Sequence, residues 1–236
     1  MKNIIERIQD KDWHLISNNL NDKGYAVVKD ILTKEECNEL IKDYTSDHYR
    51  KTVVMERYRF GIGEYKYFSY PLPEIITSIR ETVYPHLAKV ANLWMQVLNI
   101  DKTFPLKHEE LKAECHAAGQ NKPTVLILKY HEGGFNTLHQ DLYGDIYFPM
   151  QLVLFLNEPG GDYTGGEFVL TEQIPRAQSK AIVLKPKRGD MLLFTTNFRP
   201  VKGSKGYYRV NMKHGVSELH TGERHTLGII FHDALS

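Results

Sequence analysis

A long series of short β-strands in the second half of the chain is the feature that most restricts its fold. From residue 121 onward, apolar or alternating runs are separated by Gly, Pro and Asp turns, for example at 158–162 and 188–190. The expected strands cover residues 124–130, 146–157, 166–171, 180–186, 190–196, 206–216 and 224–232. Many antiparallel strands of this length are most simply closed as a jelly-roll barrel.

The first 120 residues have a different, mainly helical pattern. Helices are expected over residues 3–20, after the capping box Thr33-Lys-Glu-Glu36, and from residue 73 to about residue 98, with a short strand at 23–29. We therefore expect an α+β, mainly β, fold in one domain spanning residues 1–236. In it, residues 1–120 supply supporting helices on the outer face of a barrel core formed by 121–236.

Composition limits the classes of function. A formal net charge of +1 over 236 residues gives no global field that would favour nucleic acid or a membrane surface. The longest apolar runs, such as 152–156, are far too short to span a membrane, and the charged N-terminal segment has no hydrophobic signal core. Cys37 and Cys115 are expected to be reduced, partly buried thiols. These features predict a cytoplasmic protein without a membrane partner, and they leave its oligomeric state open.

The triplet His139-Gln-Asp141 follows the strand expected at 124–130 and a glycine turn. In an extended segment, residues i and i+2 point to the same side, so both side chains can face one metal ion. His108 and Glu110 have the same spacing but lie in a helix-prone run, where side chains two residues apart diverge. We therefore expect a metal site at His139 and Asp141 and none at His108 and Glu110.

Two later segments add to this site. The alternation of residues 208–214 places His214 on one face of a late strand, and two imidazoles with one carboxylate are the ligand set of non-haem Fe(II) oxygenases. In the next strand, Arg224 and Thr226 share a face, so Arg224 can point into the same cavity. A buried arginine needs an anion, and because no acidic neighbour in the sequence is an obvious partner, a diffusible dicarboxylate is a sensible candidate.

At these residues the chain resembles the 2-oxoglutarate/Fe(II)-dependent dioxygenase superfamily, over roughly residues 120–233. The stretch 210–234 looks like a bacterial group of uncharacterised 2-oxoglutarate/Fe(II) oxygenases. The resemblance implies a cupin-like, double-stranded β-helix barrel with His139, Asp141 and His214 on the iron as the catalytic centre.

The resemblance also implies the cosubstrate and the reaction. Arg224 and Thr226 would bind the far carboxylate of 2-oxoglutarate, and Tyr130 matches a tyrosine that contacts the cosubstrate in AlkB-type members. Oxidative decarboxylation with O2 would give succinate and CO2 and would hydroxylate a small molecule, an amino acid or a protein side chain. Ascorbate is a further reductant that such an iron centre can use.

Residues 56–70 are crowded with aromatic residues, arginines and glycines. Such a segment is typical either of a lid over a pocket mouth or of a β-hairpin packed beside the barrel, and the sequence does not decide between the two. Arg57, Arg59, Tyr65 and Tyr67 are the candidates for contact with a polar or anionic substrate.

Two other functions stay open. An AlkB-like nucleic-acid demethylase is less favoured, because the net charge is near zero and Arg224 is the single arginine of its kind after the distal histidine. A cupin-like sensor that binds a metal or a small acid without turnover would keep the same metal-binding residues.

Overall fold

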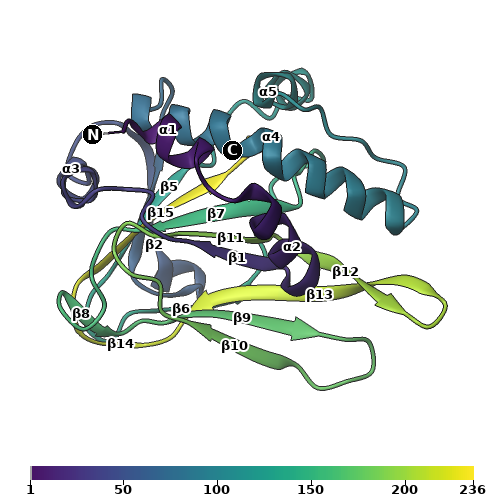
Figure 1. The fold of residues 1–236 in the computed structure, drawn as a ribbon. Helices are drawn as coiled ribbons and strands as arrows, with labels where there is room; N and C mark the ends of the chain where they lie inside the picture. Colours follow the sequence, from purple (N-terminus) through teal and green to yellow (C-terminus); the bar gives the residue numbers. More distant parts are fainter. Residues whose placement is uncertain (1) are drawn as a thin grey trace.

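The computed structural model describes residues 2–236, which form two facing β-sheets with helices on the outer side of the larger sheet (Figure 1). The helices are α1 (Ile4–Gln9), α2 (Trp13–Lys23), α3 (Lys34–Asp43), α4 (Glu74–Val97) and α5 (His108–Ala117), with a 3₁₀ turn, η1, at Met55–Tyr58. The mainly β class is therefore confirmed. Within residues 2–236, no helix has the length and apolar character needed to cross a membrane.

The larger sheet has seven strands in the order β1-β11-β7-β15-β5-β4-β2, all antiparallel to their neighbours. They are β1 (Tyr25–Val28), β2 (Tyr49–Val54), β4 (Glu64–Phe68), β5 (Leu126–Tyr130), β7 (Met150–Phe155), β11 (Met191–Thr195) and β15 (Arg224–Ile230). Strands β1, β2 and β4 come from residues 1–120. This region, expected as helical support, thus also builds part of the sheet.

The smaller sheet has the order β10-β9-β13-β6-β3, with β12 paired to β13, and β8 and β14 form a separate pair. The strands are β3 (Gly61–Ile62), β6 (Phe135–His139), β8 (Tyr163–Gly165), β9 (Phe168–Gln173), β10 (Lys180–Leu184), β12 (Phe198–Gly203), β13 (Gly206–Val216) and β14 (Leu219–Gly222). The sequence analysis did not predict β6, β8, β12 or β14, which are short or polar. Each sheet is open at its ends, so facing sheets stand where a closed barrel was expected.

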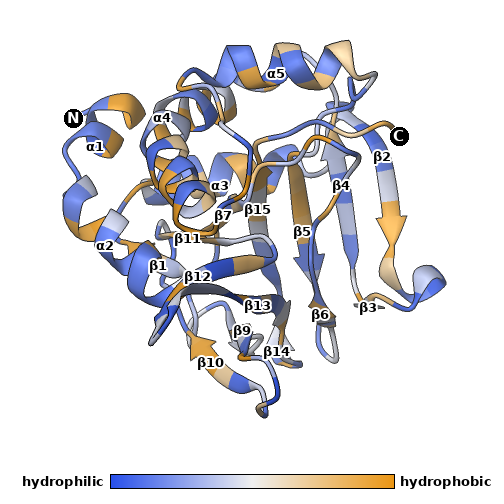
Figure 2. Ribbon diagram, turned by 90° about the vertical axis from the view of Figure 1, so that its right-hand side faces the viewer, coloured by the Kyte–Doolittle hydropathy of each residue, from blue (hydrophilic) through white to orange (hydrophobic). Residues whose placement is uncertain are grey.

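The position of β7 in the larger sheet explains why its sequence is a continuous apolar run. Leu152 and Leu154 pack into the cluster beneath the helices, whereas Val153 and Phe155 pack into the cluster between the two sheets. Successive side chains of a strand point to opposite faces, so a strand covered on both sides needs apolar residues throughout. The helices cover the outer face of the larger sheet, and each has a buried side and a side toward solvent. Helix α5 accordingly alternates between hydrophobic and hydrophilic residues in Figure 2.

The predicted capping box at the start of α3 is confirmed. The Thr33 hydroxyl accepts a hydrogen bond from the Glu36 amide at 3.2 Å, and the Glu36 carboxylate accepts one from the Thr33 amide at 2.8 Å. These reciprocal bonds satisfy two backbone donors that the first helical turn leaves free. Cys37 on α3 and Cys115 on α5 are buried free thiols, as expected.

Candidate active site

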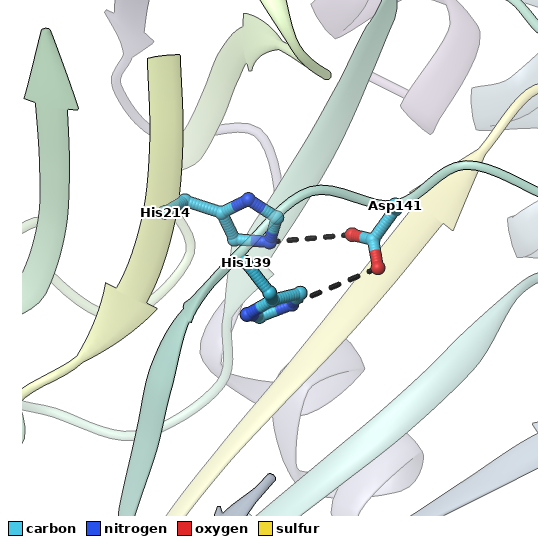
Figure 3. Close-up of side chains that lie close together, drawn as sticks. All are labelled: His139, Asp141 and His214. Atoms are coloured by element: carbon cyan, nitrogen blue, oxygen red, sulfur yellow. Dashed lines mark ion pairs between the residues drawn. The ribbon is translucent and has the colours of Figure 1, made fainter. Parts of the chain in front are cut away.

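His139, Asp141 and His214 lie close together where β6 ends beside β13 (Figure 3). His139 is the last residue of β6 and pairs directly with His214 of β13, while Asp141 lies just beyond the end of β6. The Nε2 atom of His214 is 3.2 Å from Asp141 Oδ2, and that of His139 is 3.6 Å from Oδ1. One ligand atom from each side chain lies within 4.8 Å of the other two, so the three can hold one metal ion.

Hydrogen bonding and burial prepare both imidazoles for this role. His139 Nδ1 donates to the Thr137 carbonyl at 2.7 Å, which leaves the lone pair on Nε2, the atom that faces Asp141. His214 is buried and packs against the rings of Phe168 and Phe194. Burial lowers the pKa of His214 and so favours the neutral imidazole that a metal ligand must be.

Asp141 is the anionic member of the group. Burial alone would raise the pKa of its carboxyl, but the hydrogen bond with His214 and the nearness of two protonatable imidazoles outweigh burial and hold this pKa well below the usual range. Tyr143 donates a further hydrogen bond to Oδ1 at 3.0 Å. Asp141 is therefore ionised and available as a ligand at neutral pH.

Arg224 is the second unusual feature of this region. Its side chain is almost fully buried, at 1% exposure, and none of its three guanidinium nitrogens has a hydrogen-bond partner among residues 2–236. The guanidinium carbon lies 5.6 Å from the ring centre of Tyr130, with Phe155 and Tyr163 at similar distances. A buried, uncompensated charge costs several kcal/mol, so the position is suited to a bound anion.

Both features open into one cavity of about 250 Å³ between the two sheets. Its lining includes all the predicted metal-site and cosubstrate residues together with two of the predicted substrate residues, namely His139, Asp141, His214, Arg224, Thr226, Tyr130, Tyr65 and Tyr67. Thr226 follows Arg224 on the same face of β15, and Tyr130 pairs with Arg224 across the sheet.

The other two candidates, Arg57 and Arg59, do not line the cavity. They are exposed on η1 and at its C-terminal cap, beside Tyr58 and Phe60. Phe60 does line the cavity, and its carbonyl accepts hydrogen bonds from Thr137. Of residues 56–70, β4 is an interior strand of the larger sheet and carries Tyr65 and Tyr67. The exposed segment 57–60, termed the rim, reaches the cavity through Phe60.

The sequence analysis did not identify Gln140 and Tyr143, two residues that support the candidate ligands. The Gln140 amide donates to the carbonyls of Asn197 and Met212, at 2.9 and 2.8 Å, and so ties the loop that carries Asp141 to β13. Tyr143 reaches Asp141 from the same loop, and Tyr67 donates to the Tyr143 hydroxyl at 3.1 Å. The i, i+2 spacing of Asp141 and Tyr143 was the only signal for Tyr143, and nothing in the sequence indicated the bonds of Gln140.

A known protein family and two relatives match most of the chain. The model of the Oxygenase-NA family, described as an oxygenase catalysing oxidative methylation of damaged DNA, matches residues 63–234. Uncharacterized proteins from two strains of Mycobacterium tuberculosis are 44% identical over 167 residues, which cover 71% of this chain and 72% of each relative.

Several solved structures have a similar fold. A prolyl-4-hydroxylase from Pseudomonas putida superposes with a TM-score of 0.53 at 14% identity, covering 92% of this chain and 96% of that chain. An oxidoreductase of the 2OG-Fe(II) oxygenase family from Burkholderia pseudomallei gives 0.55 at 11% identity, covering 95% and 93%. A prolyl 4-hydroxylase from Phytophthora capsici gives 0.57 at 18% identity, covering 98% and 65%. At such identities the similarity is one of fold.

Proposed function

The chain belongs to the Oxygenase-NA family and has the fold of the 2-oxoglutarate/Fe(II) oxygenases, and on this basis we propose that it couples decarboxylation of 2-oxoglutarate to oxygenation of a second substrate. One observation carries the proposal. The buried guanidinium of Arg224, which has no partner among residues 2–236, opens into the same cavity as His139, Asp141 and His214. An anion site beside a two-histidine, one-carboxylate site is what a metal-chelating dicarboxylate requires.

The donor set fits Fe(II). Two imidazoles and one ionised carboxylate would leave coordination positions for further ligands, and all three residues line the cavity. Iron held by His139, Asp141 and His214 would supply the activation of dioxygen. The hydrogen bond from His139 to the Thr137 carbonyl fixes the tautomer and the ring orientation that such a ligand needs.

The part of the cavity lined by Arg224 is the proposed site for the second carboxylate of 2-oxoglutarate. Arg224 would meet this carboxylate with its guanidinium, and Thr226 and the buried Tyr130 would add hydroxyl contacts. Arg224 is buried among aromatic rings, and such low-polarity surroundings strengthen a charge-assisted hydrogen bond formed there. The role of these residues is thus to bind and orient the cosubstrate and to keep the reacting end dry.

For the second substrate, we propose hydroxylation of a small molecule, an amino acid or a protein side chain. Tyr65 and Tyr67 line the cavity, and the exposed side chain of Phe60 stands at its rim. An aromatic wall of this kind suits a substrate that has an apolar or flat portion beside the C–H bond to be oxidised.

A nucleic-acid substrate is the second candidate. It is supported by the description of the Oxygenase-NA family and by the rim of the cavity, where Arg57 and Arg59 alternate with Tyr58 and Phe60. Exposed arginines can bind phosphates, and exposed aromatic rings can stack on unpaired bases. This rim is a local basic feature that the near-zero net charge of the chain conceals.

The proposal is tested by adding Fe(II) and 2-oxoglutarate to the metal-free protein without oxygen. The expected result is a weak visible charge-transfer band, followed by succinate release once oxygen is admitted. Stimulation of succinate release by amino acids, peptides or methylated single-stranded oligonucleotides would then assign the substrate class. A band without succinate under every condition would support the sensor function instead, and absence of the band would overturn the proposed site.

A further inference from the structure

Asp141 differs from the two histidines in how the fold holds it. His139 and His214 sit on paired strands, so the backbone ladder sets their positions. Asp141 lies beyond the end of β6, in a stretch without regular secondary structure. Main-chain pairing therefore does not orient its carboxylate, and the direction of this group depends on side-chain hydrogen bonds.

A chain of two phenol groups reaches this carboxylate. Tyr143 donates to Asp141 Oδ1 at 3.0 Å, and Tyr67 donates to the Tyr143 hydroxyl at 3.1 Å. The other carboxylate oxygen, Oδ2, is the one that lies 3.2 Å from His214 Nε2. Tyr143 thus occupies Oδ1, which also lies 3.6 Å from His139 Nε2, and leaves Oδ2 free of tyrosine contacts and directed at His214.

Tyr67, the first phenol in this series of hydrogen bonds, is held firmly by its surroundings. Tyr67 lies on β4, where it pairs with Leu126 of β5 on one side and with Lys51 of β2 on the other, and it is only 7% exposed. The Arg50 guanidinium lies over its ring at 4.7 Å and donates to the Pro123 carbonyl at 3.1 Å. Through Tyr67, strand β4 of the larger sheet therefore contributes to the position of Asp141, which belongs to the loop after β6 of the smaller sheet.

We propose that Tyr143 and Tyr67 are positioning residues that orient Asp141, so that it offers a single oxygen, Oδ2, to the metal. This inference rests on the proposed function, because it takes Asp141 as a ligand. Partners that hydrogen-bond to a metal ligand commonly contribute 10- to 100-fold to metal affinity. Tyr67 acts only through Tyr143, and its effect is therefore smaller and depends on the presence of the Tyr143 hydroxyl.

The test is a calorimetric titration of the metal-free protein with Co(II) alone. It compares the parent with Y143F, Y67F and the double variant. We expect Y143F to weaken Co(II) binding by about 10- to 100-fold and Y67F to weaken it less. The double variant should bind no more weakly than Y143F, because the two hydroxyls act in series. Y147F is the matched control from the same loop, since Tyr147 lies against His232 outside the cavity lining, and its affinity should equal that of the parent.

A second readout separates positioning from a general loss of structure. At saturating Fe(II), Y143F should keep the 2-oxoglutarate KM of the parent while its metal requirement rises. Parent-like Co(II) affinity in Y143F, additive losses in the double variant, or an equal loss in Y147F would each overturn the inference. The variant D141A distinguishes failure of the proposed metal site from failure of the proposed positioning role. If D141A binds Co(II) as the parent does, the proposed metal site is wrong; if D141A loses Co(II) and Y143F does not, only the positioning role is wrong.

Discussion

Arg224 pairs directly with Tyr130 across strands β15 and β5, and its guanidinium lies 5.6 Å from the ring of the same tyrosine. The pairing places a charged group where the core is otherwise aromatic. Because no acidic side chain among residues 2–236 forms an ion pair with Arg224, the folded protein carries a charge that a bound anion would compensate.

Arg224→Ala is expected to raise the 2-oxoglutarate requirement by about 10- to 150-fold while metal binding is kept, because a charge-assisted hydrogen bond contributes about 1.5–3 kcal/mol. Thr226→Val should cost less, since a neutral hydroxyl contributes about 0.5–1.5 kcal/mol. Arg224→Lys should rescue only part of the loss, because it replaces a planar fork with a point charge. The measurement is a 2-oxoglutarate titration of succinate release at saturating iron. Unchanged midpoints would separate Arg224 from the cosubstrate.

The same position makes a prediction about stability. Arg224→Met should stabilise the ligand-free protein by about 1–4 kcal/mol, because an apolar side chain of similar length removes a buried, uncompensated charge. 2-Oxoglutarate should raise the unfolding midpoint of the parent but not that of the variant. Urea denaturation with and without 2-oxoglutarate measures both effects. A less stable ligand-free variant would mean that the guanidinium is compensated in solution.

Asp141→Ala should abolish coupled turnover and weaken iron binding sharply, because it removes the anionic member of the donor set. His220, exposed on β14 and absent from the cavity lining, provides the control. Iron binding by His220→Ala should match that of the parent in an anaerobic titration. Loss of iron in His220→Ala, with retention in His214→Ala, would identify a different distal ligand.

Tyr65→Ala should reduce substrate-stimulated succinate release more than the slow release without substrate, because Tyr65 lines the cavity without contacting the metal. Arg57→Ala, at the exposed rim, should affect only a large or anionic substrate, and salt should weaken that effect. Steady-state assays with a small substrate and with a single-stranded oligonucleotide distinguish these cases. Equal loss of both activities together with lower thermal stability in Tyr65→Ala would indicate a structural role only.

Two buried histidines should make the protein sensitive to mild acid. Burial, with the charge of Arg80, lowers the pKa of His108 to about 3 and that of His232 to about 4. As pH falls below about 6.5, these histidines bind protons in the unfolded chain but not in the folded protein. The free energy of unfolding therefore decreases, until pH reaches about 4 for His232 and about 3 for His108. Each histidine contributes up to about 1.4 kcal/mol per pH unit in this range.

Urea denaturation between pH 7.5 and pH 4.5 checks this slope. His108→Gln keeps a donor for the Phe231 carbonyl, which His108 Nε2 contacts at 2.9 Å, and should give a shallower pH dependence. His220→Gln, at an exposed position, should keep the slope of the parent. Identical slopes in all three proteins would assign the acid sensitivity to other groups.

Local patterns were enough to predict much of the fold. Strands such as β13 and β15 follow from alternation, and the start of α3 follows from the hydrogen-bonding groups of Thr33 and Glu36. The strands that were missed have weak patterns of their own. β6, for example, has no fully buried residue, and its pairing with β13 and β3 defines it as a strand.

The sequence by itself determined the residue types of the candidate site and their spacing along each strand, because side-chain direction in a strand repeats every two residues. It thereby directed Arg224 and Thr226 to one face of β15, whereas Asp141 lies beyond the end of β6 and depends on the loop for its direction. Only the tertiary structure decided that these residues share one cavity, that Arg224 lacks an acidic partner among residues 2–236, and that η1 directs Arg57 and Arg59 outward. The contacts from Gln140 to Met212 and from Tyr67 to Tyr143 likewise join segments 72 and 76 residues apart. The physical reason is that such contacts depend on how the two sheets pack, and no local periodicity encodes that packing.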